Sequence, residues 1–213
     1  MAHQLRDTSA GVFHIWTHCV WAAQAHYRDD HDRLEFLRRL ALVTAEADWR
    51  CMGFCLMRTH FHLVVEVADG VLPVAMQSLN HGYARQFNRR HGLRGHVQSR
   101  RYGSRRLSDN ESLIQTYAYA MNNPVEAALC SRASLWPWSS FRGTLGLAPG
   151  NSFVDDGPLL GASGASSTHT PRCCGLSRSL DGTVTVAATG RGGGTVRRDA
   201  GAAGDGGVAA PAG

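Results

Sequence analysis

The chain has 213 residues, which is enough for one domain with a hydrophobic core of ordinary size. Hydrophobic residues make up 43% of it, the formal net charge is +5, and arginine supplies every basic side chain other than histidine. No apolar run approaches the length of a membrane span and the first residues are polar, so we expect no membrane association and a cytoplasmic location.

The first predicted elements are a strand and a helix. Phe13–Trp21 is rich in aromatic and β-branched residues that alternate between two faces, which is typical of a strand. Asp30–Asp48 is predicted to be a helix because apolar residues recur at helical spacing. The residues that form this apolar stripe are Leu34, Leu37, Leu40 and Ala41.

Two strand patterns and a second helix follow. Trp49–Met57 and His60–Val67 are separated by only two residues, which predicts a tight hairpin. The next apolar residues step by three or four, so they predict a helix that ends near Arg90. These residues are Leu72, Met76, Leu79, Tyr83 and Phe87.

A fourth strand and a third helix complete the regular pattern. Val97–Leu107 is predicted to be the strand, and Ser108 with Glu111 forms a capping-box pattern that starts the helix. The helix should end near Asn123, because a residue before proline disfavours the helical conformation. The order βαββαβ plus a helix predicts an α+β, ferredoxin-like sandwich, with the first and third strands in the middle of the sheet.

The chain divides into two regions of different composition. Residues 1–145 contain nearly all the aromatic residues and are predicted to form the domain, whereas residues 146–213 are rich in Gly, Ala, Ser and Thr. The second region buries too little apolar surface to offset its ordering entropy, so we expect a tail without ordered structure. The six cysteines lack paired C-x2-C spacing, which excludes the usual structural zinc patterns.

Two histidines provide the first candidate site. His60 and His62 are two residues apart on a predicted strand, so both imidazoles should project from the same face. Such a pair is half of a metal site or an acid–base pair, although two ordinary surface histidines would give the same pattern. His14 and His18 share a face of the neighbouring predicted strand and are weaker candidates for the same site.

The third predicted helix adds a nucleophile. Tyr117 continues the apolar stripe of this helix and is predicted to pack, whereas Tyr119 lies off the stripe. Asn123 is one turn beyond Tyr119 and offers a carbonyl oxygen suited to a hard divalent cation. A phenol near a metal-bound phosphate can act as a nucleophile, so Tyr119 is the candidate catalytic residue.

A basic block, His81–Arg106, lies between the histidines and the tyrosine. It contains no acid, and its arginines are interleaved with aromatic residues, which suits phosphate contacts and base stacking on single strands. A solvated helix face, or the arginine bias of a GC-rich genome, would give a similar pattern. The candidate DNA-binding residues are Arg85, Arg89, Arg90, Arg94, Arg100, Arg101, Tyr102, Arg105 and Arg106.

Several of these segments resemble a known family. The run Met57–Glu66 is similar to the histidine motif of the IS200-like transposases, and Tyr119–Ala127 resembles the tyrosine motif of their REP-associated relatives. Arg101–Ser104 and Trp136–Ser140 are similar to segments between and after those motifs. The resemblance extends from Phe13 to Gly143 with the motifs in the family's order.

The resemblance implies a metal-dependent endonuclease that cleaves single-stranded DNA, at or near imperfect hairpins, through a 5′-phosphotyrosine. It implies Mg²⁺ or Mn²⁺ held by His60, His62 and Asn123, Tyr119 as the nucleophile, and a monomer or homodimer. Two other functions compete with this interpretation. One is a hairpin-binding protein of the same fold with little or no cleavage, and the other is a histidine phosphoesterase acting on small molecules.

Overall fold

A four-stranded antiparallel sheet is the centre of the molecule. The computed structural model describes residues 7–19, 25–98, 101–164, 176–178 and 184–186. The strands lie in the order β2-β3-β1-β4, which places the first and third strands in the middle as predicted. Their bounds are Gly11–His18 (β1), Trp49–Leu56 (β2), His60–Val67 (β3) and Gly103–Leu107 (β4).

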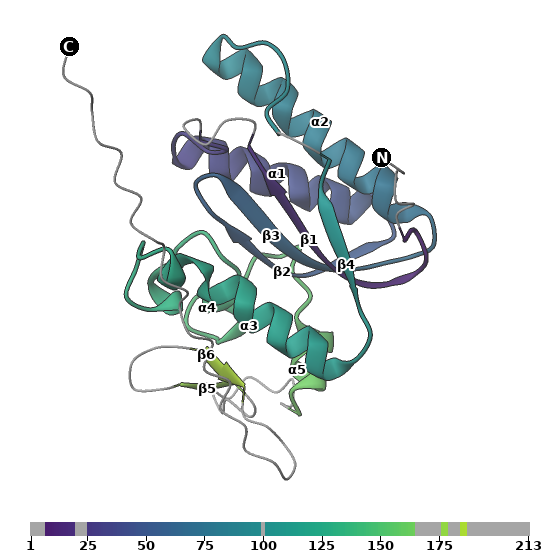
Figure 1. The fold of residues 1–213 in the computed structure, drawn as a ribbon, viewed down its shortest axis with the longest axis vertical. Coiled ribbons are helices and arrows are strands. Elements are labelled where there is room, and N and C mark those ends of the chain that lie inside the picture. The colour runs from purple at the N-terminus through teal and green to yellow at the C-terminus, as the bar shows by residue number, and fades with distance from the viewer. Residues whose placement is uncertain (1–6, 20–24, 99–100, 165–175, 179–183, 187–213) are drawn as a thin grey trace, which may run out of the picture.

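Three long helices cover the two faces of this sheet. Helices α1 (Asp30–Glu46) and α2 (Val71–His91) lie on one face, and α3 (Asn110–Glu126) lies on the other (Figure 1). The element order from β1 to β4 is βαββαβ, and α3 follows β4 as an additional helix. This confirms the predicted α+β, ferredoxin-like arrangement with a further helix.

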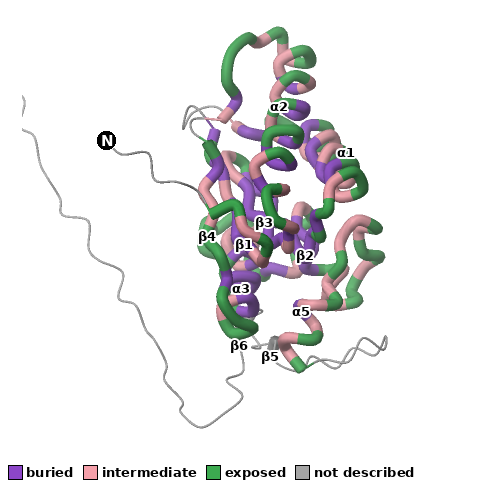
Figure 2. Tube along the Cα trace, turned by 90° about the vertical axis from the view of Figure 1, so that its right-hand side faces the viewer, coloured by how far each residue is buried: buried purple, intermediate pink, exposed green. Residues whose placement is uncertain are grey.

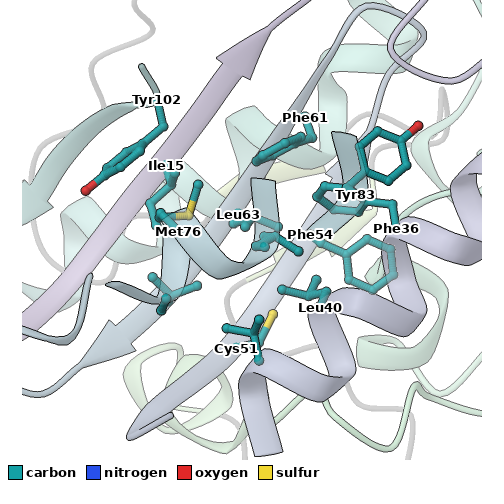
Figure 3. Close-up of a cluster of buried hydrophobic side chains, with 14 of the residues drawn as sticks. Ile15, Phe36, Leu40, Cys51, Phe54, Phe61, Leu63, Met76, Tyr83 and Tyr102 are labelled. Carbon is teal, nitrogen blue, oxygen red and sulfur yellow. The ribbon is translucent and has the colours of Figure 1, made fainter. Parts of the chain in front are cut away.

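The alternation of side chains along the strands builds a separate core on each face. Beneath α1 and α2, an aromatic core gathers around Phe36, Phe61 and Tyr83 (Figure 3). Beneath α3, Val64 of β3 packs with Tyr117 and other residues of the helix stripe. Figure 2 shows the buried positions concentrated along the sheet and the inward sides of the helices.

The predicted start of the fourth strand and the predicted buried face of the first helix were wrong. The fourth strand begins at Gly103 rather than Val97, and Gln98 contributes only an isolated bridge to Cys19. In α1, Leu34 is 58% exposed and the buried stripe runs through Phe36, because tertiary contacts set the rotation of the helix. The remaining buried residues of α1 are Asp32, Leu40 and Val43.

Both ends of α3 also differ from the prediction. Its N-cap is Asp109, which forms a capping box with Ser112, so the cap lies one residue later than the predicted Ser108. The helix continues through Pro124 to Glu126. Packing of the helix on the sheet outweighs the local disfavour for a residue before proline, and Pro124 is itself buried.

Packed chain extends beyond the predicted domain boundary at residue 145. The segment after α3 runs along the edge strand β2, where Phe54 O accepts a hydrogen bond from Ser140 N and Cys51 O accepts one from Asp155 N. Leu159 is fully buried. The fold of the described chain therefore includes residues 146–164.

Five short elements follow α3 in the described chain. They are η1 (Ala133–Leu135), α4 (Phe141–Thr144), α5 (Gly157–Ala162), β5 (Leu176–Arg178) and β6 (Val184–Val186).

No helix within the described ranges combines the length and the apolar character that crossing a membrane requires.

Candidate active site

The two histidines of β3 face the third helix. His60 and His62 occupy alternate positions on the strand, so their side chains share the sheet face covered by α3. Their cross-strand partners in β1 are His18 and Trp16 respectively. The ring centroids of His60 and His62 are 5.2 Å apart, and the two rings are nearly perpendicular. The sheet therefore presents two imidazoles as a pair.

The two tyrosines of α3 have different environments. Tyr117 is fully buried, and its hydroxyl donates to Thr144 Oγ1 at 2.9 Å. Tyr119 is 48% exposed, and its ring centroid lies 5.6 Å from that of His62. Two residues on a helix diverge by about 200°, so only one of them can lie beside the histidines. The structure places Tyr119 there.

Asn123 brings an oxygen to the same place. Its Oδ1 lies 3.4 Å from His60 Nε2, and its Nδ2 donates to the backbone oxygen of Tyr119 at 3.3 Å. The second contact orients the amide, because the nitrogen is used within the helix and the oxygen is left facing the histidines. Continuation of α3 past Pro124 keeps Asn123 in regular helix, one turn after Tyr119.

A third histidine joins the group from β1. His14 Nε2 lies 2.9 Å from His62 Nδ1, and the two rings are stacked. Both side chains are almost completely buried. His18 is also adjacent, since its ring centroid lies 5.3 Å from that of His60. The weaker candidates His14 and His18 therefore lie beside the predicted pair, which their positions on one strand face had indicated.

Burial favours the neutral form of His14, His60 and His62. Desolvation, with smaller contributions from neighbouring histidines, lowers the pKa of His62 to about 3. Desolvation and the charge of Arg105 lower the pKa of His14 to about 4. The pKa of His60 is lowered as well, mainly by desolvation. Neutral imidazoles have a nitrogen lone pair available, which is the form that binds a metal ion.

The donors present fit a divalent cation. His62 Nε2 is buried without a hydrogen-bond partner, so in the tautomer that carries its proton on Nδ1 its lone pair is available. His60 Nε2 and Asn123 Oδ1 face each other beside it. Within the part of the chain that the structure describes, no group of three His, Cys, Asp or Glu residues is placed to hold a metal. A site here would therefore depend on two imidazoles and one amide oxygen.

The predicted DNA-binding arginines fall into two groups. Arg90 is engaged by acids of the α1 terminus, because it lies 2.7 Å from Asp29 Oδ2 and 2.5 Å from Asp32 Oδ1. Arg106 pairs with Asp7 near the N-terminus. The basic block itself contains no acid, but the fold brings acids from other segments to Arg90 and Arg106.

The other arginines of the block that the structure describes remain accessible. Arg85, Arg89, Arg94 and Arg101 are exposed, and no ion pair involves them within the described ranges. The exposed Arg105 donates from Nη2 to Thr116 Oγ1 at 2.9 Å, beside the histidine site. Tyr102 is buried in the aromatic core, and Arg100 lies outside the described residues.

Comparison with known proteins identifies the family of this chain. The model of the family "Transposase IS200 like" matches residues 11–123, which is more than half of the chain. The chain belongs to the IS200-like transposases. The matched range begins at β1 of this transposase and ends at Asn123, so it includes both histidines and Tyr119.

A solved structure has the same fold as this transposase. It is described as the structure of a REP-associated tyrosine transposase bound to a REP hairpin, and it superposes with a TM-score of 0.53 at 17% sequence identity. The similarity covers 73% of this chain and 94% of the other. No curated protein matched the transposase sequence.

Proposed function

We propose that this transposase is a metal-dependent endonuclease that cleaves single-stranded DNA and transfers the strand through a 5′-phosphotyrosine on Tyr119. The observation that carries the proposal is the position of Tyr119. It is the exposed tyrosine of α3, and its ring centroid lies 5.6 Å from that of the buried His62. Family membership supports the same class of activity.

His60, His62 and Asn123 would hold Mg²⁺ or Mn²⁺. When bound, such a cation would neutralise phosphate oxygens and polarise the phosphorus toward attack. His14 would act on the site through His62. By accepting a hydrogen bond from His62 Nδ1, it would leave the lone pair on Nε2, which is the atom without a partner. We therefore assign His14 as a positioning residue.

The chemical step is a transesterification. The Tyr119 oxygen forms a bond to phosphorus while the bond from phosphorus to the 3′ oxygen breaks. The phenolic proton ends on the departing 3′ oxygen by way of solvent. The products are a free 3′ hydroxyl and a 5′ phosphate esterified to Tyr119. Since no phosphoester is lost, attack by a second 3′ hydroxyl would rejoin DNA and release the tyrosine.

The proposed substrate is single-stranded DNA at or near an imperfect hairpin. The solved relative is described as bound to a REP hairpin, which supports a hairpin partner for this chain. The exposed arginines Arg85, Arg89, Arg94 and Arg101 would contact phosphates. Replacing any one with Gln should reduce the slope of log K against log salt by about 0.7 on single strands. Arg90→Gln should change that slope little, because Arg90 is engaged by Asp29 and Asp32.

The decisive experiment compares the two tyrosines. Tyr119→Phe should abolish the covalent protein–DNA adduct while hairpin affinity and folding stay nearly unchanged, since only the hydroxyl of a half-exposed side chain is lost. Tyr117→Phe should retain the adduct. The measurement is a denaturing gel of labelled hairpin DNA, taken from the region flanking the gene, incubated with Mg²⁺ or Mn²⁺. Binding without any adduct from the unsubstituted protein would favour a hairpin-binding protein that no longer cleaves.

A further inference from the structure

A tryptophan lies on the same sheet face as the histidines and is used by neither core. Trp16 is directly opposite His62 in β3 and Gly103 in β4, and residues that face each other across antiparallel strands project to the same side. Its ring centroid lies 5.1 Å from that of His14. Trp16 is half-buried and belongs to neither hydrophobic cluster. A large aromatic surface therefore borders the site.

Gly103 is the neighbour that makes room for this indole. A Cβ at Gly103 would come within 2.6 Å of Trp16 Nε1 and closer still to ring carbons Cε2 and Cζ2. The backbone of Gly103 does not have a positive φ, so its conformation does not require glycine. The space does. Glycine weakens a strand interior, so its presence here is explained by the indole lying across β4.

Two arginines flank Gly103, the residue opposite the indole, in the sequence of β4 and the residues just before it. Arg105 is two residues beyond Gly103 on β4 and opposite His14, so it projects from the same face. Its guanidinium uses one donor on Thr116, and the group has five. Arg101 is exposed just before the strand. An aromatic surface beside arginines is suited to a nucleotide of single-stranded DNA, with the base on the ring and the phosphate on a guanidinium.

We propose that Trp16, lying across Gly103, is a stacking surface for one unpaired base next to the phosphate that Tyr119 attacks. The proposal deepens the proposed function, because it assigns a base-binding subsite within the same DNA interface. Tyr119 and Trp16 both lie beside His62, one on α3 and the other on β1. A base held on Trp16 would therefore set which phosphate of the strand lies beside Tyr119.

The test measures binding rather than cleavage. It uses the full-length chain with Tyr119→Phe, in EDTA, and hairpin oligonucleotides whose single-stranded flank lacks one base at a time. With Trp16 present, loss of the base at one or two flank positions should weaken binding by about five- to a hundredfold. In Trp16→Ala, the intact DNA should bind more weakly by a similar factor, and the same abasic positions should have no further effect.

Two further variants separate stacking from structure. Trp16→Phe should retain most of the dependence on the base, since it keeps an aromatic surface. Gly103→Ala should lower the dependence because the methyl group displaces the indole. Thermal unfolding of each variant identifies any loss of folding, and Trp138→Phe, a tryptophan that packs beside Arg33, should behave as unsubstituted protein.

The outcomes are distinct from those of the cleavage experiment. An abasic effect that is as large in folded Trp16→Ala as with Trp16 would overturn the subsite, and so would the lack of any abasic effect with Trp16 present. Failure of the unsubstituted protein to form an adduct would overturn the endonuclease instead, because the binding assay contains neither the Tyr119 hydroxyl nor a free divalent metal ion.

Discussion

Each face of the central sheet buries a histidine, but the two histidines have different surroundings. Beneath α1 and α2, His26 is fully buried among aromatic rings, and neither of its ring nitrogens has a hydrogen-bond partner. Beneath α3, His62 is almost as buried, but one nitrogen contacts His14 and the other is left open beside Asn123. The first face is a packed core that contains a histidine. The second is a core bordered by polar side chains that contact one another.

The comparison can be tested first with two adjacent residues of β3. Phe61 faces the aromatic core, and His62 faces α3. Phe61→Ala should lower the free energy of unfolding by about 3–5 kcal/mol, because it leaves a cavity. His62→Ala should remain folded but lose cleavage by about a hundredfold or more, since a divalent cation contributes several kcal/mol of charge stabilisation. Urea unfolding and the rate of adduct formation measure the two effects. Equal losses of stability would contradict the division between the faces.

Lowering the pH should destabilise the fold through the buried His26. Its pKa is lowered from 6.5 to about 3, mainly by desolvation and further by His60, while Asp32 acts in the opposite direction. Below pH 6.5 the unfolded chain therefore binds a proton that the folded chain does not. His26 should reduce the free energy of unfolding by about 1.4 kcal/mol for each pH unit from 6.5 down toward 3.

The control for this prediction is His26→Leu, which removes the titrating group. His14 and His62 have lowered pKa values as well, so the unsubstituted chain should lose stability on acidification through more than one histidine. The difference between the two proteins isolates His26. Urea unfolding from pH 7 to pH 4 measures it, and parallel stability curves for both proteins would show that His26 is not buried in the neutral form.

The pairing of His14 with His62 can be separated from packing by measuring metal affinity. His14→Phe keeps an aromatic ring against Trp16 but cannot accept a hydrogen bond from His62 Nδ1. Mn²⁺ affinity, measured by calorimetry, should fall by about 10- to 100-fold, as is usual when the partner of a metal-binding histidine is lost. His14→Gln can still accept that hydrogen bond and should recover part of the affinity. Unchanged affinity in His14→Phe would remove the positioning role.

The smallest effects come from a pair of glycines, one on each side of the sheet. A Cβ at Gly53 would overlap the ring of Tyr117 beneath α3, so Gly53→Ala should cost about 1–3 kcal/mol of unfolding free energy. A Cβ at Gly82 of α2 would meet Arg39 Nη1 at 2.8 Å, which is the flexible end of a long side chain. Gly82→Ala should be neutral or stabilising by up to about 1 kcal/mol, given the helix propensity of alanine. Thermal unfolding of both variants measures the contrast.

Local patterns in the sequence were sufficient for most of the fold. Alternation placed His60 and His62 on one face, and the position of Tyr117 on the apolar stripe of its helix separated it from Tyr119. These predictions needed only the period of a strand or a helix, which is set by backbone geometry. The element order then predicted the central pair of strands.

Tertiary structure decided the features in which distant segments compete or combine. Pro124 lies within α3 because packing on the sheet stabilises the last turn, and Leu34 is exposed because contacts of α1 set its rotation. Arg90 is engaged by acids that are about sixty residues away in the chain. The contact of His14 with His62 and the overlap of Trp16 with Gly103 depend on strand register. Register and docking are long-range properties, so no local period in the sequence contains them.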